Sequence, residues 1–258
     1  MNQRRHPWTY VGCLGASLLV LSLLGLVAIG SRPGLLERLS RGDQVAEWPD
    51  GDQIGEWSGG ESSGPPMEAP PPVAIDGPGG SEWLVASGGT DQVGTGPLYR
   101  YRVEVETATG HDPNEVARVV DAVLVHSRGW RNAGVAFQRV GVDAGPVEMV
   151  IRLATPATVD RLCAPLETNG QVSCRNGIDV VLNQRRWENG VDAYAGDVES
   201  YRILLINHEV GHLLGHAEHV PCPGPGQPAP VMMPVYYEGL QGCAPNLWPY
   251  TEDGRFIG

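Results

Sequence analysis

Alternation of apolar and polar residues in the middle of the chain predicts four β-strands. Residues 99–106, YRYRVEVE, place an apolar side chain at every second position, as in a strand with one buried face. Residues 135–140, 147–154 and 178–183 are short runs rich in valine, leucine and other apolar residues, which also favour strands. We therefore expect a β-sheet built from these segments.

A helix is expected between the first two of these strands. Asp112 is a suitable N-cap, Pro113 suits the first helical position, and Glu115 adds to a start resembling a capping box. One apolar stripe follows at helical spacing, formed by Val116, Val119, Val120, Val123 and Leu124. Gly129 is a plausible stop. The order strand, helix, strand predicts a crossover unit in a mixed sheet.

A second helix is predicted from about residue 198 to residue 214, where Gly215 fits a residue that ends a helix in the left-handed conformation. Residues 183–197, NQRRWENGVDAYAGD, are interpreted as a long connection to this helix. We assign the folded domain to residues 83–258, with an α+β fold.

The N-terminal part of the chain has a different composition. Residues 11–30 form an uncharged apolar run long enough to cross a bilayer, and residues 31–82 are rich in Gly, Pro and Ser. We interpret residues 1–10 as a cytoplasmic N-terminus, 11–30 as a transmembrane signal anchor and 31–82 as a disordered linker. Secretion after cleavage of a signal peptide is the alternative.

The net charge of −12 argues against a nucleic-acid partner, since such proteins need a basic surface. Four cysteines follow the apolar run and lie in two near pairs, which suits disulfides in an oxidising compartment. They are Cys163, Cys174, Cys222 and Cys243. We expect the bonds Cys163–Cys174 and Cys222–Cys243, and a single-pass membrane protein with its folded domain outside the cell.

Residues 208–212, HEVGH, are the strongest indication of chemistry. His208 and His212 are four residues apart on the predicted helix, so both imidazoles can reach one metal ion. Glu209 stands beside them, where a carboxylate can take a proton from a metal-bound water. This arrangement predicts a zinc site for hydrolysis, with Glu209 as the catalytic base.

The third ligand is less certain from the residues alone. His216 is too far along an unbroken helix from His208, because a helix rises by about 1.5 Å per residue and Zn–N bonds are about 2 Å long. Beyond a turn at Gly215 the candidates are Glu218 and His219. Zinc accepts oxygen or nitrogen, so chemistry does not choose between them.

At these residues the sequence resembles the metzincins, zinc endopeptidases with the signature HExxHxxGxxH and a downstream turn containing methionine. His208, Glu209, His212 and Gly215 match, whereas the position of the third histidine holds Glu218. The resemblance implies a twisted mixed β-sheet with a crossover helix, an active-site helix and an irregular, disulfide-tied C-terminal part. The segment APVMMPVYY, residues 229–237, looks like the methionine turn.

A closer resemblance, from Tyr99 to Tyr250, is to an actinobacterial family of exported or membrane-anchored proteins catalogued as a domain of unknown function and regarded as probable zinc peptidases. The blocks DRLCAPL, NHEVGHLLGH, PCPGPGQPAPVM and GCAPNLWPY carry it. That family is expected to have Gly-His-Gly-His after the helix, so a one-residue insertion brings His219 into register. The resemblance thus favours His219 as third ligand, keeps Glu218 as the alternative, and favours Met232 beneath the metal.

These observations predict a membrane-tethered extracellular zinc endopeptidase that binds an extended peptide along a sheet edge at residues 178–183. The alternative is a non-catalytic envelope module in which zinc only stabilises the domain. Glu209 favours the enzyme, because a structural zinc site needs no base.

Overall fold

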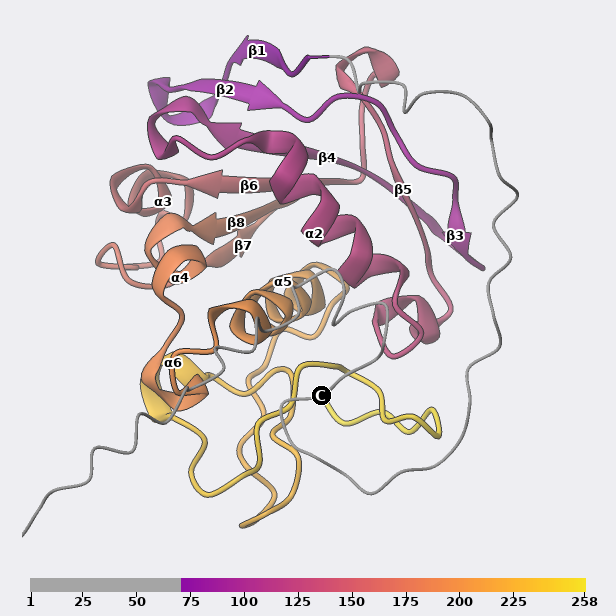
Figure 1. Ribbon diagram of the computed structural model, residues 1–258, viewed down its shortest axis with the longest axis vertical. Helices are drawn as coiled ribbons and strands as arrows, with labels where there is room; N and C mark the ends of the chain where they lie inside the picture. The colour runs from indigo at the N-terminus through magenta and orange to yellow at the C-terminus, as the bar shows by residue number, and fades with distance from the viewer. Residues whose placement is uncertain (1–70) are drawn as a thin grey trace, which may run out of the picture. The chain divides into compact units, whose positions relative to one another are not determined.

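An eight-stranded mixed β-sheet lies at the centre of the part of the chain that the structure describes, residues 71–258 of a computed structural model (Figure 1). The strands are β1 (Val73–Asp76), β2 (Glu82–Val85), β3 (Val93–Gly94), β4 (Leu98–Glu106), β5 (Ala136–Arg139), β6 (Met149–Ala154), β7 (Cys174–Asn176) and β8 (Asp179–Asn183). The four strands predicted from alternation are β4, β5, β6 and β8.

The main path of the sheet runs β1-β2-β4-β6-β8-β7, and β5 pairs with both β4 and β3. The pairs β4/β5, β4/β6 and β6/β8 are parallel, and the remaining pairs are antiparallel. The mixed sheet that the sequence predicted is therefore present.

Five α-helices complete the described part of the chain. They are α2 (Pro113–Val125), α3 (Pro156–Leu162), α4 (Gln184–Asn189), α5 (Val198–Leu213) and α6 (Val235–Glu238). Short 3₁₀ helices are η1 (Pro78–Gly80), η2 (Thr107–Thr109), η3 (Trp130–Ala133), η4 (Val142–Ala144) and η5 (Asp192–Tyr194). Helix α2 connects the parallel strands β4 and β5, and Asp112 caps it by accepting from the Asn114 N–H at 2.8 Å, so the predicted crossover unit is confirmed.

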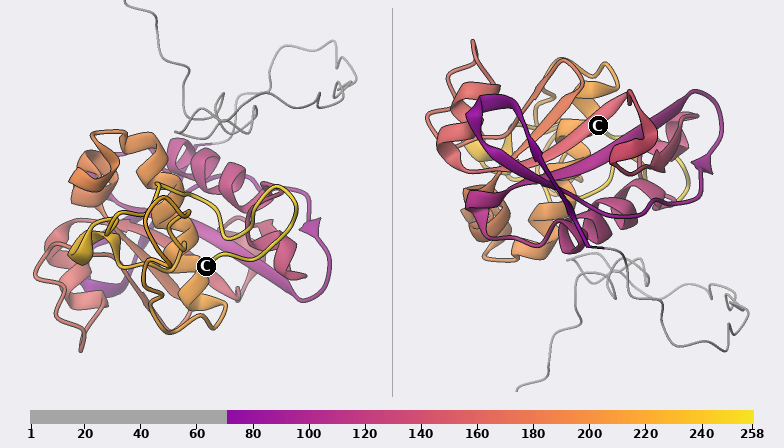
Figure 2. Two further views of the ribbon diagram at one scale, coloured as in Figure 1. Left: turned by 90° about the horizontal axis from the view of Figure 1, so that it is seen from below. Right: turned by 90° about the horizontal axis from the view of Figure 1, so that it is seen from above.

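The main hydrophobic core lies between one face of the sheet and helices α2 and α5. Alternate residues of three central strands point into it, as their two-residue period requires. They are Tyr101, Val103 and Val105 of β4, Met149, Ile151 and Leu153 of β6, and Val180 and Leu182 of β8. Figures 1 and 2 show the segments that follow α5 on the side of that helix away from the sheet. Helix α5 is consequently buried between two layers.

The opposite face of the sheet carries buried charges. Arg152 of β6 forms ion pairs with Glu104 of β4 and with Asp179 of β8, the latter at 3.2 Å, and its guanidinium lies 5.1 Å from the ring centre of Trp83. A second core, which includes Trp83, Val159 and the disulfide Cys163–Cys174, adjoins it. This face of the sheet is thus covered by paired charges and a small apolar cluster.

Secondary structure is already present before residue 83, the expected start of the folded domain. Strand β1 and helix η1 fall within residues 71–82, which the sequence assigned to the linker. Residues 73–76 pair with residues 82–85 in an antiparallel hairpin, and β2 pairs with β4. These strands are stabilised by pairing to the sheet edge, a contribution that glycine- and proline-rich composition does not reveal.

The predicted substrate edge is corrected by the structure. Strand β8, within residues 178–183, is an interior strand between β6 and β7. The end of the sheet on this side is β7, which pairs with β8 as an antiparallel hairpin through Gly177, whose φ is +61°. The sequence reading missed β7 because this strand has three residues and two of them, Arg175 and Asn176, are polar and exposed.

The expected anchor at residues 11–30 lies outside the described residues, as do residues 1–10 and most of the expected linker. Within residues 71–258, no helix is both long and apolar enough to cross a membrane.

Glu106, at the end of β4, joins two parts of this fold. Its buried carboxylate accepts hydrogen bonds from Ser81 Oγ at 2.6 Å, Thr158 Oγ1 at 2.6 Å and the Thr155 N–H at 2.7 Å. Burial raises the pKa of Glu106, but these hydrogen bonds together outweigh burial and hold the pKa below its ordinary value. The ionised form therefore stabilises the fold.

Replacing this carboxylate should destabilise the protein in a pH-dependent way. We expect Glu106→Gln to lower the free energy of unfolding by about 1.5–3 kcal/mol at neutral pH. A carboxylate whose pKa is depressed by folding stabilises fully above its unfolded pKa of about 4.3, and this contribution is lost as the pH falls through the folded pKa. Urea denaturation from neutral to acid pH should show the difference from wild type shrinking; a constant difference would contradict this account.

Candidate metal centre

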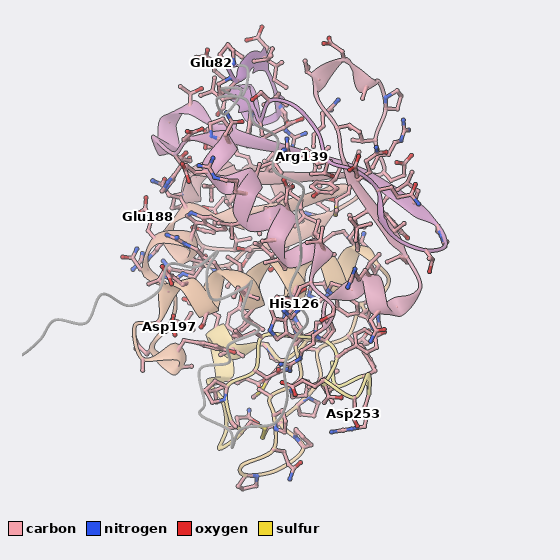
Figure 3. The ribbon with its side chains drawn as sticks, turned by 45° about the vertical axis from the view of Figure 1, so that its right-hand side comes forward. Glu82, His126, Arg139, Glu188, Asp197 and Asp253 are labelled. Carbon is pink, nitrogen blue, oxygen red and sulfur yellow. A yellow bond between two sulfur atoms is a disulfide. The ribbon has the colours of Figure 1, made fainter. Side chains whose placement is uncertain are left out.

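Helix α5 carries two of the three histidines that the structure brings together. It begins at Asp197, labelled in Figure 3, whose side-chain oxygens accept from the Ser200 N–H at 3.1 Å and from Ser200 Oγ at 3.0 Å. This N-cap satisfies donors that the first turn leaves open. The helix ends at Leu213, and Gly215 follows with φ +104°, a conformation that other residues rarely adopt. The predicted helix and its glycine stop are confirmed.

The turn at Gly215 brings a third histidine back towards the helix. The His216 N–H donates to the Gly211 carbonyl at 3.0 Å, which closes the turn. One possible ligand atom each from His208, His212 and His219 then lies within 4.8 Å of the others. Three nitrogens bound to one tetrahedral zinc are about 3.3 Å apart, given Zn–N bonds of about 2.0–2.1 Å. The three rings are therefore near enough to converge on a single ion if they move closer together.

Hydrogen bonds fix which nitrogen two of these rings offer. Nδ1 of His208 lies 2.8 Å from the Val231 carbonyl oxygen, and Nδ1 of His212 lies 2.8 Å from the His216 carbonyl oxygen. A carbonyl can only accept, so Nδ1 carries the hydrogen in both rings. Burial is the main cause that lowers the pKa of His208 to about 3 and also lowers the pKa of His212. Both rings are therefore neutral and present Nε2 as a free lone pair.

Glu209 provides a carboxylate beside the histidines. It is 5% exposed, and burial raises its pKa to about 8. Its Oε2 atom is buried and has no hydrogen-bond partner among the described residues, and the side chain lines the same cavity as the three histidines. A buried carboxylate oxygen without a partner is costly to the fold, which points to a partner outside the protein chain.

Gly211 and Met232 are in direct contact beneath the site. A Cβ atom placed on Gly211 would lie 2.4 Å from Met232 Sδ and 2.7 Å from Trp130 Cζ2, so only glycine fits between them. Met232 and Trp130 are both fully buried, and Trp130 Nε1 donates to the Asn207 carbonyl at 2.7 Å. Met232, expected beneath the metal, thus packs against the helix turn between the two histidines.

The loop that carries His219 is held from both sides. The Val220 N–H donates to the Met232 carbonyl at 3.1 Å, and a disulfide joins Cys222 to Cys243. The other predicted bond, Cys163–Cys174, is also present, and it lies at the start of β7. Both expected disulfides are therefore found.

Glu218, His216 and two tyrosines of the neighbouring cavity wall are not part of the histidine cluster. Glu218 is exposed and is not part of the histidine group, so the structure places His219 rather than Glu218 next to the helical histidines. The ring of His216 packs on Trp130, with ring centres 4.8 Å apart. Tyr236 Oη donates to Gln171 Oε1 at 3.3 Å, and Tyr237 is 63% exposed.

A cavity of about 330 Å³ opens beside the three histidines. Its wall is apolar on several sides, and its charged members besides Glu209 are two arginines. The lining includes Leu166, Arg175, Arg186, Tyr201, Leu204, Leu205, Val235, Tyr236 and Tyr237. A volume of this size accommodates one amino-acid side chain, and the mixture of apolar wall and a few polar groups is typical of a ligand site.

A family model described as "Protein of unknown function (DUF3152)" matches residues 70–238. The chain belongs to the DUF3152 family. The matched part runs from β1 to α6 and contains all three clustered histidines and Glu209. No curated protein and no solved structure matches the chain.

The sequence analysis missed two arginines of this DUF3152 site. Arg175 of β7 donates from Nε and Nη2 to the His212 carbonyl at 3.2 and 3.1 Å, in addition to the Gly215 N–H, which donates to the same carbonyl at 3.3 Å. Arg186 lies in α4, within the segment interpreted as a connection. Asn183 caps α4 by accepting from the Arg185 N–H at 2.9 Å, a signal visible in the sequence.

The contact at Gly211 should make this position intolerant of even one methyl group. We expect Gly211→Ala to lower the free energy of unfolding by about 1–3 kcal/mol, because Met232 and Trp130 must move. Thermal and urea denaturation of the purified protein would measure it. In the double variant with Met232→Ala the losses should be less than additive, since the nearest obstructing atom is gone; full additivity would show that the two residues do not interact.

Proposed function

We propose that this DUF3152 protein is a zinc-dependent endopeptidase, tethered to the membrane through residues 11–30, with its folded domain outside the cell. The observation that carries the proposal is the combination of three clustered histidines with the buried, unpartnered Glu209 carboxylate at a cavity. The two disulfides support a location in an oxidising compartment.

The donor set fits zinc. His208 and His212 are neutral and offer Nε2, and His219 would supply the third nitrogen. Three protein ligands leave a fourth position for water or substrate, which distinguishes catalytic zinc sites from closed structural sites. A bound zinc ion would lower the pKa of water and polarise a substrate carbonyl.

Glu209 would act as the proton carrier. It is adjacent to His208 in the chain and lines the cavity that would receive the peptide. Burial raises its pKa to about 8 in the protein alone, which favours the protonated acid at neutral pH. A cation bound by the histidines would favour the ionised form, which can accept a proton from the attacking water and return it to the leaving amide nitrogen. Arg175, by binding the His212 carbonyl, would hold the end of α5 in position during both transfers.

Several features favour a metzincin-like arrangement. They are the HEVGH segment on α5, the turn at Gly215, and Met232 packed beneath the helix. Strand β7, antiparallel to β8 at the end of the sheet, borders the cavity through Cys174 and Arg175. An extended substrate would pair with this strand through main-chain hydrogen bonds, which require no particular sequence.

The identity of the third ligand can be tested by metal content. Loss of a residue that only hydrogen-bonds to a metal ligand weakens metal binding by roughly 10–100-fold. We expect His219→Ala to weaken zinc binding by more than this, because it removes a ligand itself. The matched variant is Glu218→Ala, one residue away and also exposed, which should retain zinc. Mass-spectrometric metal analysis and zinc titration of the full-length protein would measure both. Zinc lost in Glu218→Ala but retained in His219→Ala would reverse the assignment.

The catalytic role of Glu209 can be separated from metal binding. Glu209→Gln keeps the size of the side chain but cannot accept a proton, so we expect zinc to be retained and hydrolysis of peptide libraries to fall by about 10²–10⁴-fold. The readouts are zinc content and cleavage measured on the same preparation. Undiminished cleavage would exclude Glu209 as the base, and a wild-type protein that binds zinc but cleaves nothing would favour a stabilising role for the metal.

A further inference from the structure

Arg186 is a buried cation in the wall of the cavity beside the three histidines. Its side chain is 9% exposed, and its guanidinium carbon lies 5.1 Å from the ring centre of Tyr236, another residue of the cavity wall. Nη1 donates to the Gly190 carbonyl at 2.9 Å, whereas the buried Nε has no hydrogen-bond partner in residues 71–258. The guanidinium therefore retains unused hydrogen-bonding capacity, and Arg186 lines both this cavity and a neighbouring hollow.

Two other arginines with low exposure, one buried and one half-buried, are paired with carboxylates. Arg152 pairs with Glu104 and Asp179, and Arg139 pairs with Asp121 at 2.9 Å. Among the described residues, no carboxylate lies within ion-pair distance of Arg186. An unpaired buried charge is costly, and a planar guanidinium fits a carboxylate in a two-bond arrangement. Arg186 thus has the chemistry of a site for an anionic group supplied from outside.

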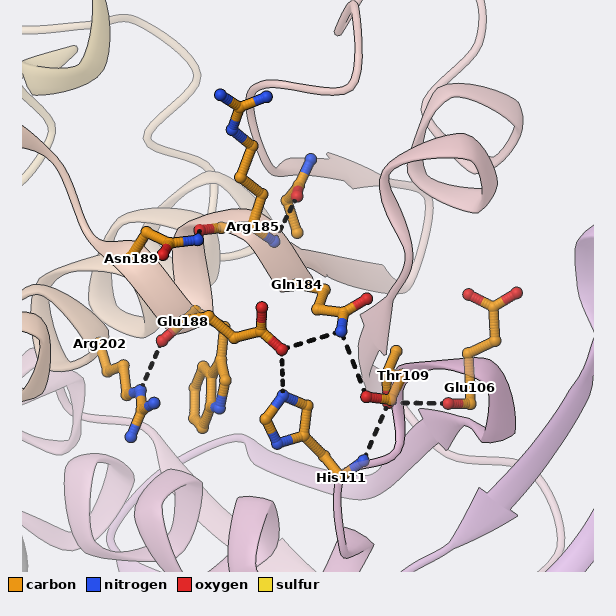
Figure 4. Close-up of polar contacts among 10 residues, drawn as sticks. Glu106, Thr109, His111, Gln184, Arg185, Glu188, Asn189 and Arg202 are labelled. Atoms are coloured by element: carbon orange, nitrogen blue, oxygen red, sulfur yellow. Dashed lines mark hydrogen bonds and ion pairs between the residues drawn. The ribbon is translucent and has the colours of Figure 1, made fainter.

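Contacts between helix α4 and its neighbours hold Arg186 in a fixed position. Figure 4 shows the polar contacts that other residues of α4 make. Gln184 Nε2 donates to the Thr109 carbonyl at 3.2 Å, and Glu188 Oε1 contacts His111 Nε2 at 3.0 Å. On the other side, Arg202 of α5 donates to the Trp187 carbonyl at 2.7 Å. The helix is therefore attached both to the region before α2 and to the metal-site helix, so the guanidinium is preorganised.

The cavity favours a negative ligand at this point. Its other arginine, Arg175, adds a second positive charge, although that side chain is already bonded to the His212 carbonyl. Glu209, beside the metal ligands, is the carboxylate in the lining. The chain's net charge of −12 repels an anion at long range. Salt, however, largely screens exposed charges that are more than about 10 Å away, whereas a direct buried contact is screened much less.

We propose that Arg186 binds a carboxylate of the substrate, so that the enzyme prefers peptides with an aspartate or glutamate side chain beside the cleaved bond. This inference rests on the proposed peptidase function and names its substrate class. A peptide's C-terminal carboxylate has the same chemistry and is the other possible source of the ligand.

Cleavage of peptide libraries tests the preference. An equimolar library with amidated C-termini presents carboxylates only as side chains, and a second library with free C-termini and no acidic residues presents only the terminal group. We expect wild-type protein to cleave acidic peptides of the first library at least about tenfold faster than peptides with glutamine or asparagine instead. If the first library shows no preference for acidic peptides but peptides of the second library are cleaved faster than their amidated counterparts, the ligand is the terminal carboxylate. This result would overturn the assignment to acidic side chains.

Arg185→Gln is the matched control for Arg186→Gln. Arg185 is the preceding residue of α4, is exposed, and lines a neighbouring hollow but not the cavity of the histidines. Figure 4 shows its guanidinium without a drawn contact. Arg186→Gln should reduce the acidic preference to less than about threefold, and Arg185→Gln should leave it unchanged. A preference that survives Arg186→Gln, or that is lost equally in Arg185→Gln, overturns the inference while leaving the peptidase function intact.

Two further measurements keep the outcome decisive. Arg186→Lys retains the charge without the planar fork, so a folded Arg186→Lys protein should keep part of the preference even where Arg186→Gln fails to fold. If no library is cleaved, the peptidase proposal fails, and ligand-observed NMR with N-acetyl-glutamate amide and N-acetyl-glutamine amide still tests Arg186. Stronger binding of the glutamate compound to wild type and Arg185→Gln, but not to Arg186→Gln, supports the carboxylate site; equal binding of both compounds to wild type overturns it.

Discussion

The candidate site depends on the contacts of the segment Val231–Met232 with helix α5 and with the loop that follows this helix. The Val231 carbonyl binds Nδ1 of His208, and the Met232 carbonyl binds the N–H of Val220, next to His219. Met232 also fills the space left open by Gly211. One short segment therefore holds a helical histidine and the loop of the third histidine, and a change in its position would separate the cluster.

The electrostatics of the site follow from burial. Three imidazoles and a carboxylate lie together, and burial keeps His208 and His212 neutral while raising the pKa of Glu209. Within residues 71–258, Oε2 of this carboxylate has no hydrogen-bond partner and Arg186 has no counter-charge, whereas Arg152 and Arg139 are paired with acidic residues. Two of the three buried side-chain atoms without a hydrogen-bond partner in residues 71–258 belong to these two residues of the cavity wall, and the third is Asn207 Oδ1. Unsatisfied charged groups at a cavity are expected where a ligand completes their interactions.

Sequence reasoning located the elements whose periodicity is strong and local. Strands β4, β5, β6 and β8, helices α2 and α5, and both disulfides were expected, because alternation, capping residues and cysteine spacing encode them directly. The sequence analysis did not predict the short elements β1, β2, β3, β7, α3, α4 and α6. The strands among them are stabilised by pairing with their neighbours in the sheet. Arg186 was overlooked for the same reason, since a single arginine in an apparent connection carries no pattern.

The sequence alone could not decide between the adjacent residues Glu218 and His219 as the third candidate ligand. Chemistry allows either side chain to bind zinc, so the choice depends on the register of the loop after Gly215. That register is set by the bond between the Val220 N–H and the Met232 carbonyl, and by the disulfide of Cys222. Both are contacts with residues much later in the chain. With Val220 hydrogen-bonded to Met232, the residue before it, His219, lies beside the two helical histidines, whereas Glu218 is exposed and outside the cluster.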